Sequence, residues 1–109
     1  MNRIAKFTVL GITLAMLGTS VATAQTPWER SHPRRDQVND RLANQNARIN
    51  DEYREGGLTW RQAARLHRED QIIRQEERFM AHFNNGHITP AEQRALNQQL
   101  NGVSRQIGY

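Results

Sequence analysis

The stretch NNGHITPAEQ, residues 84–93, carries residue types that could bind calcium. Four of its residues match an EF-hand loop: Gly86 stands for the glycine, Ile88 for the apolar residue, Thr89 for the ninth position and Glu92 for the bidentate acid. The same stretch also describes a helix start, in which Thr89 caps, Pro90 takes the first helical position and Glu92 completes a capping box. One interpretation predicts a cation site and the other a structural turn.

The first half of the loop decides between the two interpretations. When the glycine takes the sixth position, Ala81 and Phe83 take the first and third, and neither offers a side-chain oxygen. In a similar turn thirty residues earlier, Asp51 fits the first position, but Tyr53 occupies the third and Gln62 replaces the terminal acid. We therefore predict helix starts at both turns. Cation binding by these degenerate EF-hand-like glycine turns is the alternative function.

Other residues that could carry chemistry are sparse. The chain has no cysteine and no Gly-rich phosphate loop, and it has few serines near histidines, so we expect neither an enzyme nor a bound cofactor. His67 and Asp70 form an i,i+3 pair that could begin a metal site. Helical projection, however, places His67 and His82 away from the apolar stripe of their helix, which predicts that both face solvent. We expect no metal site there.

The elements that position these residues are helices. Apolar residues recur at helical spacing in three stripes: Val38, Leu42, Ile49 and Tyr53; Leu66, Ile73 and Met80; Leu96, Leu100, Val103 and Ile107. Between the stripes lie EGG and NNG, whose glycines and Asn85 suit the left-handed residue that ends a helix. The pattern predicts an all-α fold, a three-helix antiparallel bundle with helices at residues 33–55, 60–84 and 90–107.

The two connections between these helices resemble each other. A shift of 30 residues superposes GGLTWRQAARL on GHITPAEQRAL. The shared unit is a helix, a glycine turn, an apolar residue and a Thr-capped new helix. The predicted bundle is therefore built from two helix-turn-helix echoes.

The first 24 residues differ from the rest of the chain. Arg3 and Lys6 precede the apolar run FTVLGITLAMLGTSVA, and ATA at residues 22–24 offers a small-residue cleavage site, which is typical of a secretory signal peptide. We expect a flexible segment at residues 25–32 and the helical domain at 33–109. Without cysteine, the exported chain has neither a disulfide nor a lipidation site. We therefore expect a periplasmic or secreted protein that is not stably inserted in a membrane.

The charge balance argues against a nucleic-acid partner. The sequence pI is about 10.6, but two of the 15 basic residues lie in the predicted signal peptide, which leaves 13 arginines against 11 acids. Acids interleave with these arginines at i,i+3 and i,i+4 spacing, which is typical of solvated helix faces. We expect no nucleic-acid binding.

The helix predicted at residues 60–84 has acids inside a broad apolar sector. Ile72, Phe79 and Phe83 lie on one side of the sector, the stripe of Leu66, Ile73 and Met80 lies on the other, and Glu69 and Glu76 fall between. Partly buried carboxylates need partners. We predict a network of Glu69 and Glu76 with arginines of the neighbouring helices, for which Arg41, Arg48 and Arg105 are the candidates, and with the amides of Gln45 and Asn46. The alternative is that the middle of the sector is a partly open groove in which both acids stay solvated.

The second apolar side of this helix is the candidate interaction surface. Ile72, Phe79 and Phe83 form a sizeable cluster, which we expect to be only partly shielded and bordered by Arg65 and Arg68. Such a cluster suits a dimer contact or a client-binding patch. The alternative is that the first and third helices cover both sides and leave an inert monomer.

Two resemblances are carried by these residues. HPRRDQVNDRLANQNARI, LHREDQIIRQEER and NNGHITPAEQRALNQQLNGVSRQI together resemble a group of small exported helical proteins of Gram-negative bacteria, over nearly the whole chain after the signal peptide. LTWRQ at residues 58–62 is similar to the LTxxQ motif of the Spy/CpxP family, whose members are periplasmic stress proteins and chaperones. The first resemblance supports the predicted boundaries and compartment and implies no activity, whereas the second implies a chaperone-like or envelope-stress role. We expect a non-catalytic helical protein that interacts with other envelope proteins or with itself.

Overall fold

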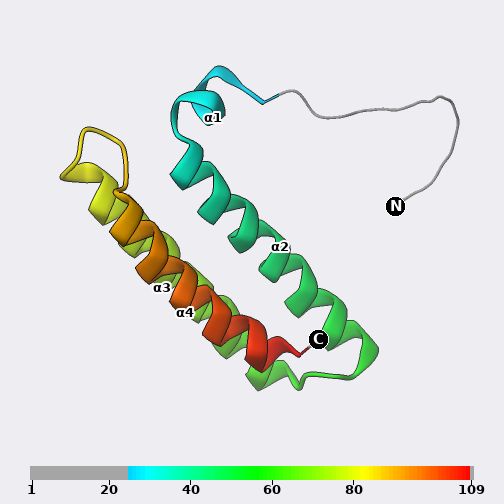
Figure 1. The fold of residues 1–109 in the computed structure, drawn as a ribbon. Helices are drawn as coiled ribbons and strands as arrows, with labels where there is room; N and C mark the ends of the chain where they lie inside the picture. Colours follow the sequence, from blue (N-terminus) through cyan, green and yellow to red (C-terminus); the bar gives the residue numbers. More distant parts are fainter. Residues whose placement is uncertain (1–24, 109) are drawn as a thin grey trace, which may run out of the picture. The chain divides into compact units, whose positions relative to one another are not determined.

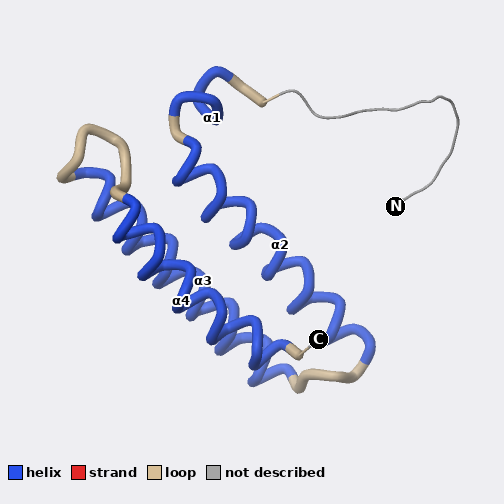
Figure 2. Tube along the Cα trace, viewed as in Figure 1, coloured by secondary structure: helices blue, strands red, loops and turns tan. Residues whose placement is uncertain are grey.

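The structure is a computed structural model that describes residues 25–108. The regular secondary structure of these residues is helical. Four helices follow one another: α1 (Pro27–Ser31), α2 (Pro33–Glu55), α3 (Trp60–His82) and α4 (Pro90–Ile107) (Figure 1). Only helices and loops occur in these residues (Figure 2). The predicted bounds of α2 and α4 are confirmed, whereas α3 ends two residues earlier than predicted. The predicted signal peptide, residues 1–24, lies outside the described residues.

The short helix α1 is an addition to the three predicted helices, and it lies in the segment expected to be flexible. Thr26 and Glu29 hold its first turn, because the Glu29 amide donates to Thr26 Oγ1 at 3.1 Å and the Thr26 amide donates to Glu29 Oε1 at 2.8 Å. The side chain of Arg30 donates to the carbonyl of Gln25 at 2.6 Å. Local bonds of this kind account for a single helical turn.

A shared core lies between α2, α3 and α4, each of which packs against the other two. The buried apolar side chains come from all three helices and both connecting turns: Val38, Leu42, Ile49, Leu58, Ala63, Leu66, Ile73, Ala81, Ile88, Leu96, Leu100, Val103 and Ile107. The predicted stripe of α4 is buried in full. Tyr53 was predicted to be in the stripe of α2, but it is 47% exposed because α2 reaches its last turn there.

Both turns are built as the sequence predicts. Thr59 and Thr89 each accept a hydrogen bond from the third residue of the following helix, and the side chain of that residue accepts one in return, so both capping boxes are complete. Gly56 and Gly86 have φ values of +88°, in the left-handed region. The apolar residue between glycine and threonine is buried in each turn, as the echo requires.

The caps lead to a first prediction about stability. Replacing Thr59 or Thr89 by alanine should each lower the free energy of unfolding by about 1 kcal/mol, because one amide of the first helical turn loses its acceptor. Gly86→Val should cost more than either, since a β-branched residue is strained at φ +88°. Chemical denaturation monitored by circular dichroism measures all three changes. Unchanged midpoints would mean that the caps do not hold the turns.

Candidate functional site

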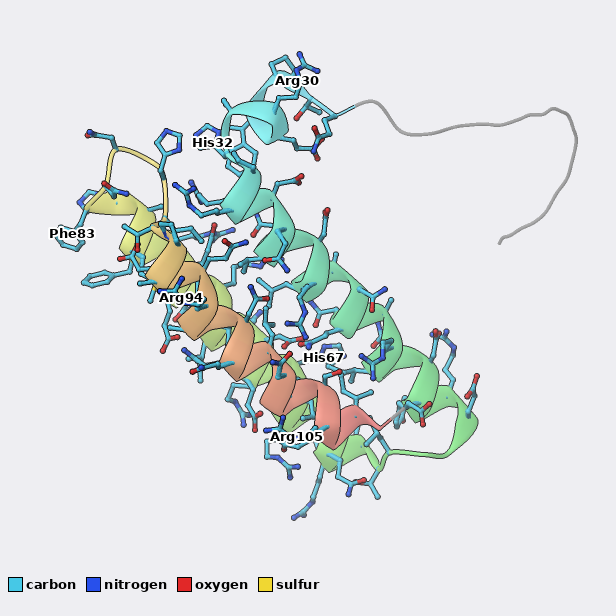
Figure 3. All side chains as sticks on the ribbon, in the orientation of Figure 1. Arg30, His32, His67, Phe83, Arg94 and Arg105 are labelled. Carbon is cyan, nitrogen blue, oxygen red and sulfur yellow. The ribbon has the colours of Figure 1, made fainter. Side chains whose placement is uncertain are left out.

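A row of large apolar side chains lies exposed on α3. Ile72 is 47% exposed, Phe79 is 66% exposed and Phe83, at the C-cap, is 72% exposed. The rings of Phe79 and Phe83 pack edge to face with their centroids 4.8 Å apart. Figure 3 shows Phe83 pointing away from α2. These three side chains, named here the outer row, match the predicted interaction surface.

A groove between α3 and α4 runs along the outer row. It consists of two depressions, of about 280 and 460 Å³, which share Ile72 and Gln99. The first is lined by Glu69, Ile72, Ile73, Gln99, Gly102, Val103 and Gln106, and the second by Ile72, Gln75, Glu76, Phe79, Met80 and Gln99. Gly102 keeps the α4 wall low, because only the end of the Arg105 side chain, at 3.8 Å, lies near the position of a Cβ there.

The α4 side of this groove was not predicted from the sequence. Gln99, Gly102 and Gln106 recur at i, i+3 and i+7, which places them on one helical face beside the buried stripe. That spacing was the available signal, although a row of amides and a glycine is also typical of a solvated face. These three residues belong to the candidate site because they line the groove opposite residues of α3.

The two predicted border arginines are both exposed on α3. Arg65 pairs loosely with Glu69, with 3.6 Å between Nε and Oε2, and it donates to Gln106 Oε1 at 3.4 Å. Gln106 in turn donates to Glu69 Oε1 at 3.3 Å. Arg65, Glu69 and Gln106 thus form a small Glu/Arg/amide group at the rim of the groove.

The predicted network of Glu69 and Glu76 is wrong in its partners. Arg48 donates instead to Ser104 Oγ at 2.9 Å and to the carbonyl of Gly108 at 2.6 Å. Arg105 is exposed on α4 (Figure 3). Glu76 is partly buried, and its Oε1 is shielded from water without a hydrogen-bond partner in the described chain.

Two other acids of α3, Asp70 and Glu77, are the fully buried ones, each 1% exposed. Glu77 forms an ion pair with Arg35 of α2, and Arg35 also donates to the carbonyl of Gly86 at 3.1 Å. The predicted buried acids lie one residue too early, because the predicted broad apolar sector has Ile72 and Phe79 on one side and Glu69 and Glu76 along its middle. α3 instead buries the single face of Ala63, Leu66, Asp70, Ile73, Glu77 and Ala81. The spacing of its apolar members, Leu66 and Ile73 among them, fits that face, but it gives no reason to place the two acids there.

Asp70 occupies a polar layer in the middle of the core. Neither of its carboxylate oxygens has a hydrogen-bond partner in the described chain. Burial raises the pKa of the Asp70 carboxyl from its ordinary 3.8 to about 6, the charge of Glu69 adds to the rise, and Arg74 opposes it. Gln45 of α2 is a second buried polar side chain of the core, 2% exposed. Gln45 donates to the Leu100 carbonyl at 2.7 Å, and its own Oε1 lacks a partner.

This layer predicts a pH dependence of stability. Because the folded-state pKa is raised, the unfolded chain releases the Asp70 proton first as the pH rises. Asp70 should therefore lower the free energy of unfolding between about pH 4 and pH 6, by about 3 kcal/mol in all, with no further change above pH 6. Asp70→Asn should remove this component and be the more stable protein at pH 7. Denaturation midpoints of both proteins from pH 4 to 8 measure the difference, and parallel pH curves would contradict it.

The predicted environment of His67 is also wrong. Its ring nitrogens lie 2.8 Å from Asn46 Oδ1 and 2.9 Å from Asn50 Oδ1, so the histidine bridges α3 to α2 and is half-buried between them (Figure 3). His82 is exposed, as predicted. Within residues 25–108, no group of three or more His, Cys, Asp or Glu is arranged to hold a metal ion.

The carboxylate of the second glycine turn is engaged by its own helix. Glu92 Oε1 accepts a hydrogen bond from the Thr89 amide at 2.8 Å, which confirms the helix-start interpretation of that turn. The amide oxygen of Gln62 does the same for Thr59 at 2.8 Å. The sequence features shared with an EF-hand loop therefore have a structural role in both turns.

Comparison of the chain with protein-family models, curated proteins and solved structures gave no match. None of the four described helices is long and apolar enough to cross a membrane.

Proposed function

We propose that the protein is a small exported, non-catalytic helical protein that binds apolar segments of other proteins, in a chaperone-like role in the bacterial envelope. In this proposal residues 1–24 are a signal peptide, and residues 33–109 are a three-helix antiparallel domain built from two helix-turn-helix echoes. Its working surface is the outer row of α3 together with the groove beside it.

The observation that carries the proposal is the exposure of the outer row on a domain whose core is complete without it. Core positions on α3 are filled by other residues, Leu66 and Ile73 among them, which are 0% and 3% exposed. An adjacent pair of phenylalanine rings more than half exposed costs solubility, and contiguous exposed apolar side chains with a polar rim mark interaction sites. Aromatic side chains are also the ones that contribute most to binding at interfaces.

The chemistry of the groove fits a polypeptide segment. Its floor contains Ile72, Ile73, Met80 and Val103, which can receive apolar side chains. Its rim carries glutamine amides and carboxylates, which can bond to backbone groups and to basic side chains of a bound segment. Surfaces that bind many different sequences use side chains that can repack, and Met80 and the glutamine side chains of the groove are flexible in this way.

Suppression of aggregation tests the proposal. Reduced insulin precipitates after its disulfides are cleaved, and the reducing agent leaves this chain intact because it has no cysteine. The purified protein should slow that precipitation, and the double variant Ile72→Ser/Phe79→Ser should lose most of the effect. Trp60→Ser is the matched control, since Trp60 is 68% exposed on the same helix but outside the outer row.

Calorimetry with calcium and zinc separates the proposal from the alternative of a cation-binding protein. Micromolar cation binding in a protein that leaves insulin precipitation unchanged would replace the proposed function with the alternative. Protection of insulin that depends on the outer row and not on added cations would support the proposal.

A further inference from the structure

The outer face of α3 carries a pattern that is complementary to itself. Seven residues fall within one sector of about 80° when the helix and its C-cap are projected at 100° per residue. They are Arg61, Arg65, Arg68, Ile72, Glu76, Phe79 and Phe83. The steps from Ile72 are four, three and four residues in both directions, so the spacing is the same from either end. The half before Ile72 is basic, and the half after it is aromatic and acidic.

We propose that a partner of this face is a second copy of the chain, whose α3 packs antiparallel on the first around a two-fold axis at Ile72. This inference rests on the proposed function, because it names a partner for the same surface. In this arrangement Ile72 meets Ile72 of the second copy, and Arg68 faces Glu76 of the second copy. Two-fold interfaces require a patch that complements itself, and the spacing of the seven residues satisfies that requirement.

Arg68 and Glu76 are the charges that such a pair would satisfy. Within residues 25–108, Arg68 makes no hydrogen bond or ion pair, and Glu76 Oε1 is shielded from water without a partner. The two residues lie about 12 Å apart along the helix axis, so they cannot pair within one chain. In the antiparallel dimer, Arg68 of each copy lies opposite Glu76 of the other copy, so the pair forms twice. A shielded carboxylate oxygen gains most from a cation delivered in this way.

The ends of the face pair arginines with aromatic rings. Arg65 faces Phe79 of the second copy, and Arg61 faces Phe83 of the second copy. Guanidinium groups stack favourably on aromatic faces, and their apolar stems cover ring surface that is otherwise in water. The Arg65–Glu69 contact is loose and half-exposed, so it can rearrange. The resulting seam extends about 33 Å, from Arg61 to Phe83.

Charge reversal tests this geometry through sedimentation velocity of the purified protein. Arg68→Glu and Glu76→Arg should each weaken self-association by about tenfold or more, because each variant places two like-charged pairs across the axis. An equimolar mixture of the two variants should form a heterodimer at least as tight as the parent dimer. Arg78→Glu is the control, since Arg78 is exposed on α3 outside the sector, and it should associate like the parent.

Three results would overturn the inference, and they differ in what they mean for the proposed function. Single variants that associate like the parent, or a mixture that fails to pair, would exclude the two-fold axis at Ile72. A parent that stays monomeric but protects insulin through the outer row would exclude the second copy as partner and leave the proposed function standing. A monomer that also fails to protect insulin would contradict both.

Discussion

Replacing Arg35 by alanine is expected to lower the free energy of unfolding by about 3–5 kcal/mol. The change leaves the carboxylate of Glu77, only 1% exposed, without its cation in the core between α2 and α3. It also removes a donor from the carbonyl of Gly86, in the turn that precedes α4. A domain of this size has a total stability of about 4–12 kcal/mol, so the variant should be largely unfolded at moderate temperature.

Two further variants show whether the missing cation causes this loss. The double variant Arg35→Met/Glu77→Leu should recover to within about 1 kcal/mol of the parent, because no buried charge is left unpaired. Arg54→Ala, which breaks the exposed ion pair with Asp51, should cost less than about 1 kcal/mol. Urea denaturation at low protein concentration measures all of them. A cost for Arg35→Ala no larger than that for Arg54→Ala would contradict the buried pairing.

The double variant Ile72→Ser/Phe79→Ser is expected to keep its helical signal while losing both self-association and protection of insulin. The two side chains are 47% and 66% exposed, so their removal should change the free energy of unfolding by about 1 kcal/mol or less. The binding effect should be much larger, because aromatic and branched apolar anchors carry most of the energy of an interface.

The matched control for this variant lies on the buried face of the same helix. Leu66→Ser/Ile73→Ser introduces the same two serines at residues that are 0% and 3% exposed. Each change should cost several kcal/mol through lost burial and a cavity, so the helical signal should disappear. Cooperative loss of helicity in the Ile72/Phe79 variant instead would show that the outer row is core, and it would remove the interaction surface.

The helix bounds were predictable because their signals are local. Pro33 marks the start of α2 and Gly56 its end, while Thr89 and Gly108 flank α4, and each of these signals acts within one turn of chain. The early end of α3 also has a local cause, since Asn85 and Gly86 both adopt positive φ after a turn that begins at Phe83. The prediction extended the helical period to Asn84, and hydrophobic spacing alone could not show that the turn starts earlier.

The buried face of α3 was not predictable in the same way. Hydrophobic spacing places Ile72 and Phe79 beside Ile73, and it gives no reason to bury Asp70 or Glu77. Glu77 can be buried because Arg35, 42 residues away, supplies the opposite charge, and that contact exists only after the helices pack. The residues of the outer row could be identified from the sequence. Their exposure depends on which faces of α3 are covered by α2 and α4, and that is set only when the helices pack.

Binding at the outer row is tested most directly by measuring how accessible the groove beside it is while reduced insulin is bound. Because the chain has no cysteine, Gln75→Cys places a single thiol on α3 next to Phe79, and Ala43→Cys places one on an exposed position of α2. Their labelling rates by a maleimide are compared with and without reduced insulin, the thiols of which are blocked beforehand. We expect the rate at position 75 to fall several-fold while the rate at position 43 is unchanged. Equal rates at position 75 with and without bound insulin would contradict it.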